Sequence, residues 1–454
     1  MKKILTLALS LISVAAAAQQ TGGITPEMLG RISGAYAGDA HDKAIRNALN
    51  TTDINVLATN ADKIAMPETS FSDRVVTKGI TNQKKSGRCW LFTGLNVLRA
   101  AAIQKYALGD FQFSQSYCFF YDQLEKANLF LQAVIDTREK PMSDREVDWL
   151  FSNPIGDGGT FTGVANLVTK YGLVPADVMP ESYIANSTSQ MSAQLRTLLR
   201  QDGLKLRETP SGVKKKDMGA YLQGLKEEML GEVYRILALC LGEPPAYFEW
   251  QGKTVTPVQF YQELLGYDLE HGYVMLMNDP SREYGKVYEI RYDRHLYDGQ
   301  NWLYVNLPIE RIKEMAIASI KDNVAMYFSC DVAKQLNRPK GVCDLENYDY
   351  ESLLGVKFTM DKKQRILTHA SGSSHAMTLV GVNLEDGVPD RWLVENSWGD
   401  TGYKGHIIMT DDWFNEYMFR LVVERKYVPE DVLKMLEQTP VQLPAWDPMF
   451  LNEE

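Results

Sequence analysis

The stretch Gln83-Lys84-Lys85-Ser86-Gly87-Arg88-Cys89-Trp90 holds the strongest structural and chemical signal in this chain. Its first part is a polar, glycine-containing turn. From Cys89 onward, apolar residues recur at the spacing of a helix that is buried on most of its circumference. Cys89 is therefore expected at a helix start, where free backbone N–H groups and the helix dipole stabilise a thiolate. Taken alone, a cysteine at such a position is more often a small packed core residue.

Two later segments supply the groups that a thiolate nucleophile requires. His375 stands at the entry to an apolar strand in Ser374-His375-Ala376, and Asn396 follows another strand in Glu395-Asn396-Ser397-Trp398. A nucleophile needs a base within hydrogen-bond reach, and the base needs a third group that orients it. Each segment alone is weak evidence for a catalytic site, since an isolated histidine is more often structural. Together and in this order, Cys89, His375 and Asn396 resemble the catalytic set of papain-like cysteine peptidases.

The papain resemblance implies roles for further residues. It makes Gln83 the side-chain donor to the developing oxyanion, and it makes Trp398 a cover for the hydrogen bond between His375 and Asn396 and a candidate substrate contact. The chain also departs from papain. Ser86 replaces the cysteine that forms a disulfide there, and the interval from Cys89 to His375 is about twice the roughly 130–150 residues of papain relatives. A large insertion is therefore expected between nucleophile and base.

Several stretches resemble a narrower family, that of bleomycin hydrolase and the bacterial aminopeptidase C. The resemblance is weakest from 185 to 300, and it rests on the segments 83–99, 170–175, 179–182, 318–322, 330–332, 375–396 and 432–449. It implies a homohexameric ring and a carboxy-terminal tail that lies in the unprimed half of the cleft. The carboxylate of Glu454 would then meet the free amino terminus of a peptide substrate. Without the family, such a terminus would be expected to be frayed and solvated.

A glycine pair, Gly158-Gly159, resembles the site on which papain-like enzymes lay the substrate backbone. Glycine permits this approach because no Cβ intervenes. The alternative is an ordinary tight turn. The sequence therefore gives Gly158, Gly159, Trp398 and Glu454 as candidate substrate-binding residues.

Composition excludes several classes of protein. The chain has 454 residues, 45% of them apolar and 23% charged, which fits a folded globular protein rather than a disordered one. The net charge of −10 argues against nucleic acid as the main partner, because duplex binding requires concentrated positive charge. No Cys-x-x-Cys or His-x-x-x-His spacing occurs, so no zinc site, other metal or cofactor is expected.

The amino terminus has the pattern of a cleaved secretory signal. Lys2 and Lys3 precede an apolar run that ends in small residues at Ala18 and is too short to span a bilayer as a helix. The alternative is a short buried helix. We expect an exported protein, periplasmic or extracellular, with no membrane attachment after cleavage. Its five cysteines are an odd number, so at least one thiol is expected to be unpaired or paired between chains.

The predicted fold is α+β, a papain-like arrangement of a helical lobe with Cys89 and a β lobe with His375 and Asn396. Four parts are expected along the chain: the signal 1–18, the helical lobe 19–184, an inserted helical and mixed subdomain 185–300, and the β lobe with its tail 301–454. Before residue 70, only one helix is predicted, around 41–49. Other expected helices are 164–171, 218–241, 309–320 and 430–436, and expected strands include 376–382, 391–394, 406–409 and 419–423.

The sequence favours a secreted cysteine aminopeptidase that acts on peptides and uses Cys89 as nucleophile. Two alternatives remain. If the tail does not occupy the cleft, the chain would be a cysteine endopeptidase. It could also be a catalytically silent papain-fold protein that binds peptides, although a binding role needs no nucleophile.

Overall fold

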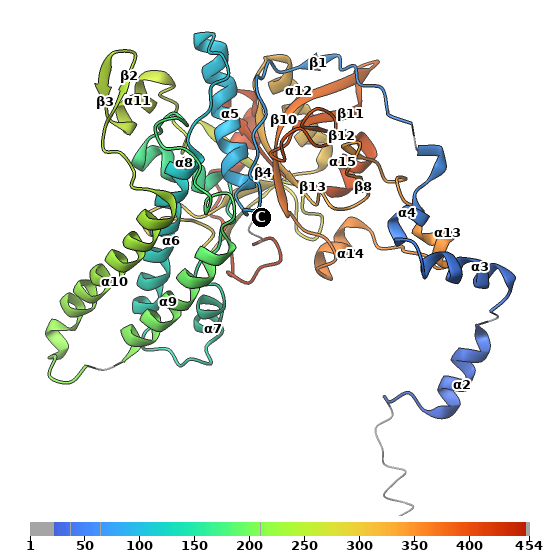
Figure 1. Cartoon of the computed structure of the whole chain (residues 1–454), viewed down its shortest axis with the longest axis horizontal. Helices are drawn as coiled ribbons and strands as arrows, with labels where there is room; N and C mark the ends of the chain where they lie inside the picture. The colour runs from blue at the N-terminus through green and yellow to red at the C-terminus, as the bar shows by residue number, and fades with distance from the viewer. Residues whose placement is uncertain (1–21, 37, 64, 209, 451–454) are drawn as a thin grey trace, which may run out of the picture. The chain divides into compact units, whose positions relative to one another are not determined.

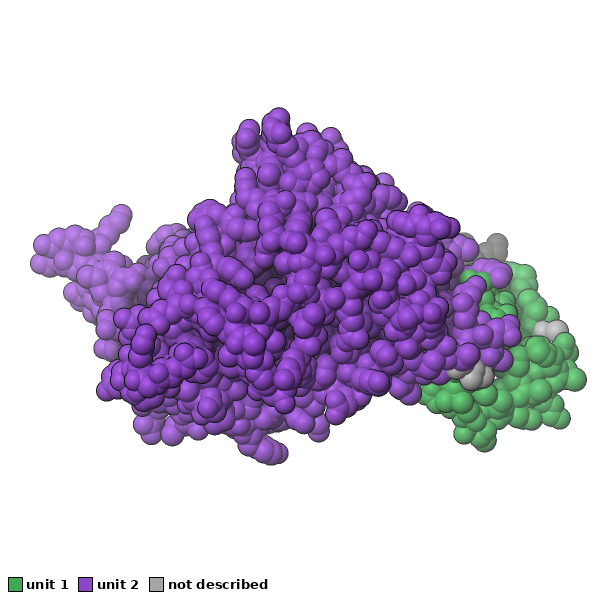
Figure 2. Space-filling view, turned by 90° about the horizontal axis from the view of Figure 1, so that it is seen from above, with its two compact units in different colours: residues 1–59, 349–356 green, residues 60–348, 357–454 purple. Residues whose placement is uncertain are grey.

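The computed structural model describes residues 22–36, 38–63, 65–208 and 210–450. Their contacts divide the chain into two compact units. Unit 1 comprises Met1–Thr59 with Asp349–Val356, and unit 2 comprises Asn60–Tyr348 with Lys357–Glu454; Figure 2 colours them green and purple. The predicted signal segment 1–18 lies outside the described residues. Every described candidate site residue belongs to unit 2.

Unit 1 is a small helical unit. It consists of α2 (Pro26–Ala35), α3 (Ala40–Leu49), α4 (Ile54–Ala58) and α13 (Tyr350–Leu354). All four helices begin at side-chain caps. Thr25 Oγ1, for example, accepts a hydrogen bond from the Met28 N–H (3.2 Å), and Asp39 Oδ1 accepts one from the Asp42 N–H (2.9 Å). Of these helices only α3 was predicted.

The helical lobe of unit 2 carries the candidate nucleophile. Its helices, visible together in Figure 1, are α5 (Cys89–Tyr106), α6 (Gln115–Asp136), α7 (Arg145–Ser152), α8 (Phe161–Tyr171), α9 (Ser189–Arg207), α10 (Met218–Leu241) and α11 (Pro257–Leu264). A hairpin of β2 (Phe248–Trp250) and β3 (Lys253–Val255) adjoins them in sequence.

Local sequence signals set the helix boundaries in this lobe. Ser114 caps α6 as predicted, since its Oγ accepts a hydrogen bond from the Tyr117 N–H at 3.0 Å. The helix α8 ends at Gly172, as predicted. Gly172 has φ 73°, and a Cβ there would lie 2.2 Å from the Pro257 carbonyl oxygen, so only glycine fits.

The β lobe is built on one mixed sheet. The order of its main path is β14-β5-β6-β4-β13-β7-β10-β11-β12-β9-β8, and β1 pairs with β10 off this path. The strands are β1 (Asp73–Arg74), β4 (Tyr273–Met277), β5 (Lys286–Ile290), β6 (Leu303–Asn306), β7 (Met326–Cys330), β8 (Leu336–Asn337), β9 (Val342–Cys343), β10 (His375–Glu385), β11 (Val388–Glu395), β12 (His406–Thr410), β13 (Met418–Glu424) and β14 (Val441–Leu443). The strands expected after residue 370 are thus confirmed.

Short helices accompany this sheet. They are α12 (Ile309–Lys321), α14 (Lys362–Leu367), α15 (Asp411–Tyr417) and α16 (Glu430–Met435). The cap of α15 comes directly before two aspartates, Asp411 and Asp412. Thr410 is the cap, because its Oγ1 accepts from the Trp413 N–H at 3.3 Å, while the two aspartates occupy the first turn.

Two buried apolar clusters form the core of unit 2. One lies mainly among the helices, and the other lies between the sheet and α12 and α15. Helix α5 packs against β10, which brings the start of one element to the start of the other. The α+β, two-lobed expectation is confirmed. The boundary predicted at residue 300 remains a prediction, although β4 to β6 pair within the sheet of the β lobe.

Among the helices of the described residues, none combines the length and the apolar character needed to cross a bilayer. All five cysteines lie within the described part of the chain, and no disulfide joins any two of them. Cys118, Cys330 and Cys343 are buried, as is common for cysteines that pack as small apolar residues.

Candidate active site

Cys89 is the first residue of α5 and is fully buried. Its neighbour Arg88 is the N-cap and makes no side-chain capping bond. The backbone of α5 therefore presents its positive end to the Cys89 side chain, as the sequence predicted. This placement favours the thiolate form of the cysteine.

His375 begins β10, directly beside the nucleophile. The N–H of the next residue, Ala376, donates a hydrogen bond to Cys89 Sγ at 3.4 Å. The imidazole Nε2 lies 2.9 Å from Asn396 Oδ1. That oxygen also accepts the Ser397 N–H at 2.8 Å, so it is an acceptor and Nε2 must carry the proton. The other ring nitrogen, Nδ1, is then the one that can exchange a proton with the thiol.

Trp398 covers this pair. Its ring centroid lies 4.8 Å from that of His375, with an angle of 33° between the planes. His375 and Asn396 are each only 2% exposed. A hydrogen bond that is shielded from water in this way keeps its strength, and it holds the imidazole in one orientation.

Gln83 is held at both ends of its side-chain amide. Its Oε1 accepts a hydrogen bond from Ser397 Oγ (2.7 Å), and its Nε2 donates to the Ser86 carbonyl oxygen (2.7 Å). The Gln83 backbone N–H also donates to the Ser397 carbonyl oxygen at 2.8 Å. The second N–H of Nε2 remains for an oxyanion. The structure thus brings together Cys89, His375, Asn396 and Gln83, whose catalytic roles remain predictions.

The glycine pair lies in a buried loop between α7 and α8. The Gly158 carbonyl oxygen accepts a hydrogen bond from Lys126 Nζ at 2.6 Å. A Cβ at Gly159 would lie 2.2 Å from His295 Cε1 and 2.9 Å from Trp90 Cδ2. Packing beneath the loop therefore already requires glycine at 159. Substrate binding by this pair is still a prediction.

A buried charged cluster beneath this loop was missed by the sequence analysis. His295 Nδ1 lies 2.6 Å from Asp122 Oδ1, and Lys126 Nζ donates to Asp122 Oδ2 at 2.8 Å. Burial opposes ionisation of Asp122, but Lys126 and His295 outweigh it and lower the pKa of the carboxyl. Burial lowers the pKa of His295. Asp122 and Lys126 are four residues apart on α6, but His295 lies far from both in sequence, so no local pattern indicates the whole cluster.

A second buried ion pair joins the two lobes near Asn396. Arg99 of α5 pairs with Glu395, the residue before Asn396, and both are almost completely buried. Burial raises the pKa of Glu395, although Arg99 opposes this shift. The pair links the helix that begins at Cys89 to the strand that ends at Glu395, one residue before Asn396.

The described tail ends beside the cleft at Phe450. Arg420 Nη2 donates to the Met449 carbonyl oxygen at 2.6 Å, and the Phe450 ring lies 5.3 Å from the Trp149 ring. Two cavities, of about 300 and 290 Å³, share Trp149 and Phe450 in their walls. The first reaches Gly156 in the glycine loop, and the second reaches Gly372 before His375. Glu454 lies outside the described residues.

No metal site is apparent in the described ranges, where no three His, Cys, Asp or Glu side chains converge as metal ligands would. His369, six residues before His375, is exposed.

Comparison with known families identifies this arrangement. The model of the Peptidase C1-like family matches residues 23–450. The chain belongs to this family. Chicken bleomycin hydrolase is 42% identical over 393 residues, covering 82% of this chain and 86% of that protein. Aminopeptidase G of Lactobacillus delbrueckii subsp. lactis is 38% identical over 435 residues, covering 93% of this chain and 98% of that protein.

A solved structure shares the whole architecture. The PepW structure from Lactobacillus rhamnosis HN001 has a TM-score of 0.88 and 33% sequence identity, and the match covers 95% of this chain and 100% of that one. The expected papain-like fold of the bleomycin hydrolase and aminopeptidase C family is confirmed.

Proposed function

We propose that this chain is a bleomycin-hydrolase-like cysteine aminopeptidase with Cys89 as its nucleophile. The observation that carries the proposal is the Cys89 thiol at the start of α5, beside a histidine whose Nε2 is fixed by Asn396. The family and the relatives named bleomycin hydrolase and aminopeptidase support the same reaction.

In the proposed reaction, the Cys89 thiolate attacks the scissile carbonyl while His375 is protonated. A bond forms between Sγ and the carbonyl carbon, and the electron pair of the C=O bond moves onto the oxygen. The Cys89 backbone N–H and Gln83 Nε2 donate hydrogen bonds to that oxyanion. His375 then gives its proton to the departing amine, and water hydrolyses the thioester in a second, similar step.

The position of the tail supports removal of amino-terminal residues rather than internal cleavage. Met449 is fully buried and held by Arg420, and Phe450 packs on Trp149 beside cavities that reach both lobes. A chain end placed there would block longer substrates on the unprimed side. A carboxylate at that end, such as that of Glu454, would attract the α-amine of a peptide.

We also propose export and assembly into a ring. Lys2, Lys3 and the apolar run that follows support cleavage after Ala18 and release outside the cytoplasmic membrane. The homohexamer rests on the family resemblance. Mass spectrometry of the mature amino terminus tests the first proposal, and sedimentation of the mature protein tests the second.

The decisive experiment for the activity uses one peptide in two forms, free and acetylated at its amino terminus. Stepwise loss of residues from the free form alone is the expected result. Cleavage inside both forms would support an endopeptidase with an open cleft. Absence of cleavage by the reduced chain, with Cys89 still alkylatable, would favour the peptide-binding alternative. A Cys89→Ala variant should fold normally and lose turnover.

A further inference from the structure

The loop 82–88 carries the oxyanion donor Gln83 into the active site. Within the loop, Ser86 Oγ donates to the Gln83 carbonyl oxygen at 2.7 Å, and Gln83 Nε2 donates back to the Ser86 carbonyl oxygen. Lys84 adopts a positive φ of 54°, and its N–H donates to Asn82 Oδ1 at 3.0 Å. A non-glycine residue with a positive φ costs free energy, so this turn persists only if contacts with neighbouring residues stabilise it.

Arg88 fixes the end of this loop from inside the protein. Its side chain is fully buried, and its Nε donates to Ser86 Oγ at 2.9 Å. The guanidinium carbon lies 5.2 Å from the Phe92 ring centroid and 5.1 Å from that of Phe119. A planar cation is therefore placed beside two aromatic rings, one residue before the nucleophile.

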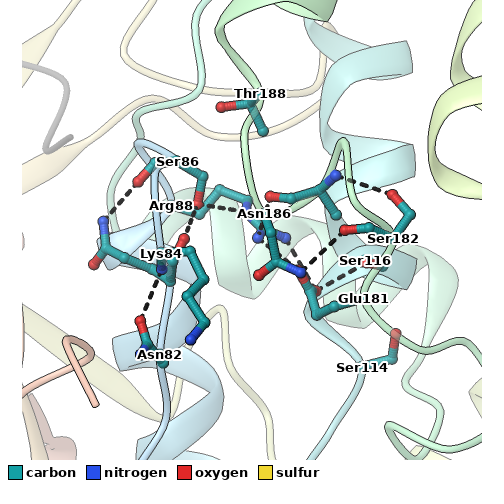
Figure 3. Close-up of polar contacts among 12 residues, drawn as sticks. Asn82, Lys84, Ser86, Arg88, Ser114, Ser116, Glu181, Ser182, Asn186 and Thr188 are labelled. Carbon is teal, nitrogen blue, oxygen red and sulfur yellow. Dashed lines mark hydrogen bonds and ion pairs between the residues drawn. The ribbon is translucent and has the colours of Figure 1, made fainter. Parts of the chain in front are cut away.

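Glu181 is the counter-ion of Arg88. Its Oε1 accepts from Nη1 (3.1 Å) and its Oε2 from Nη2 (2.6 Å), while Ser116 Oγ of α6 also donates to Oε1 (2.8 Å). Figure 3 shows these side chains in one group, with Arg88 between Ser86 and Glu181. The two-pronged geometry matches a guanidinium and does not match an ammonium.

The segment that supplies Glu181 also pairs with the loop directly. We call residues 181–188 the brace segment. Its Ala185 carbonyl oxygen accepts from Arg88 Nη2 at 2.6 Å, and its Asn186 carbonyl oxygen accepts from the Lys85 N–H at 3.1 Å. Ser182 Oγ ties the brace segment to α10 by donating to the Cys240 carbonyl oxygen at 2.8 Å.

We propose that Arg88 and Glu181 are positioning residues that hold the Gln83 amide where the oxyanion forms. The inference rests on the proposed function and adds a support for the oxyanion donor. A continuous set of hydrogen bonds runs from Gln83 through Ser86 and Arg88 to Glu181. The hydrogen bonds from the Ala376 N–H to Cys89 Sγ and between His375 Nε2 and Asn396 Oδ1 involve none of these four residues. Loosening the brace should therefore weaken stabilisation of the oxyanion while the reactivity of the thiol is kept.

The test compares three variants with the wild-type mature chain. Arg88→Lys keeps the positive charge but loses the two parallel N–H groups that bond to Glu181. Glu181→Gln keeps the shape of the side chain but removes its negative charge. The milder Ser116→Ala removes one hydrogen bond to Glu181. Glu125→Gln is the matched control. Glu125 is another buried carboxylate of this lobe, paired with Lys170 at 2.7 Å, and it contacts neither the loop nor the brace segment.

Three quantities separate positioning from general damage. They are the steady-state parameters (kcat per alkylatable Cys89, with KM), the rate of Cys89 alkylation by iodoacetamide across pH, and the Kd of an amino aldehyde such as leucinal. The aldehyde forms a hemithioacetal: the Sγ–C bond forms, the C=O bond becomes single, and its oxygen takes the thiol proton. That oxygen occupies the oxyanion position, whereas alkylation creates no oxyanion.

The proposal expects Arg88→Lys and Glu181→Gln to lower kcat by about 10- to 100-fold, with KM changed by less than about 3-fold. In both variants the Kd of the aldehyde should rise by about 10-fold, and the rate of Cys89 alkylation should stay within about 2-fold of the wild-type rate. Ser116→Ala should show smaller changes in the same direction, and Glu125→Gln should show none. If Arg88→Lys or Glu181→Gln does not fold, the kcat and the aldehyde Kd of Ser116→Ala decide whether the proposal holds.

Two results would overturn the proposal. One is unchanged kcat and aldehyde Kd per alkylatable site, which would leave the pair a purely structural one. The other is alkylation that slows in parallel with turnover, which would place the effect on the thiol. A wild-type chain that hydrolyses no peptide would contradict the proposed function, and the aldehyde Kd values would still test the brace.

Discussion

At the scale of single residues, the site depends on side chains that are each held by more than one partner. Asn396 Oδ1 accepts from both the Ser397 N–H and His375 Nε2, and Gln83 uses both ends of its amide. Such double attachment removes alternative rotamers before a substrate arrives. The enzyme then needs little reorganisation when charge develops.

We predict that Asn396→Ala lowers kcat by about 10- to 100-fold, because His375 loses the partner that fixes its ring and its tautomer. KM should change little. Steady-state kinetics on an unblocked peptide provides the measurement. Asn383→Ala is the control and should retain activity. Asn383 lies on the same strand as His375, but its side chain bonds to Asp390 (2.8 Å) and to the Ser72 N–H (3.2 Å). Equal kcat values for Asn396→Ala and wild type would remove Asn396 from the mechanism.

At the scale of elements, the helices α9 and α10 contain one poorly satisfied charge. Asp202 of α9 is 4% exposed, and its Oδ2 has no hydrogen-bond partner among the described residues. Burial, together with the charge of Glu232, raises the pKa of Asp202 to about 6. The folded chain therefore binds a proton here between about pH 4 and pH 6 that the unfolded chain does not bind. The free energy of unfolding should fall as pH rises through that range.

We predict that Asp202→Asn stabilises the chain at pH 7.5 by about 1 kcal/mol, a figure that allows for partial screening by solvent. The gain should largely vanish near pH 4, where aspartic acid is neutral too. Urea unfolding at both values of pH measures the difference. The exposed Asp177→Asn serves as the control, with a change under about 0.5 kcal/mol. A gain of the same size at both pH values would contradict the explanation.

The helices and strands also show which parts of the structure could be predicted from the sequence. The helix α10 was predicted with its exact bounds, and β10 was predicted to within three residues at either end, because each carries a long apolar face. The start of α5 at Cys89 was predicted, but its end was not. Cys89, His375 and Asn396 were found because their chemistry is specific. Arg88 and Glu181 were both read as family sequence, but nothing in a linear pattern pairs residues from different segments. The same limit hid the Asp122–Lys126–His295 cluster.

At the scale of the whole molecule, the proposed place of the carboxy-terminal tail in the cleft would separate an aminopeptidase from an endopeptidase. We predict that truncation after Met449 gives a chain that cleaves an amino-terminally acetylated peptide at least about 10-fold faster than the full-length chain does. The reason is that both Phe450 and the terminal carboxylate are removed from the unprimed side.

Mass analysis of the products from free and acetylated peptides measures this change. Phe450→Ala, which keeps the full length of the tail but removes the ring that packs on Trp149, is the companion variant. It should keep its requirement for a free amino terminus. A truncated chain that still rejects the acetylated peptide would show that the tail does not set the specificity.

The sheet gives the tail a property beyond blocking. Strand β14 pairs with β5, and Arg420, which holds Met449, lies on β13, separated from the His375 strand β10 only by β7. The anchor of the tail and the catalytic base are therefore parts of the same sheet. In the proposed enzyme, the number of residues after Met449 would then set the distance between the chain end and His375. Removing one residue from the tail that follows Met449 would move the terminal carboxylate away from the scissile bond by the length of one residue. The proposed enzyme would then release dipeptides instead of single amino acids.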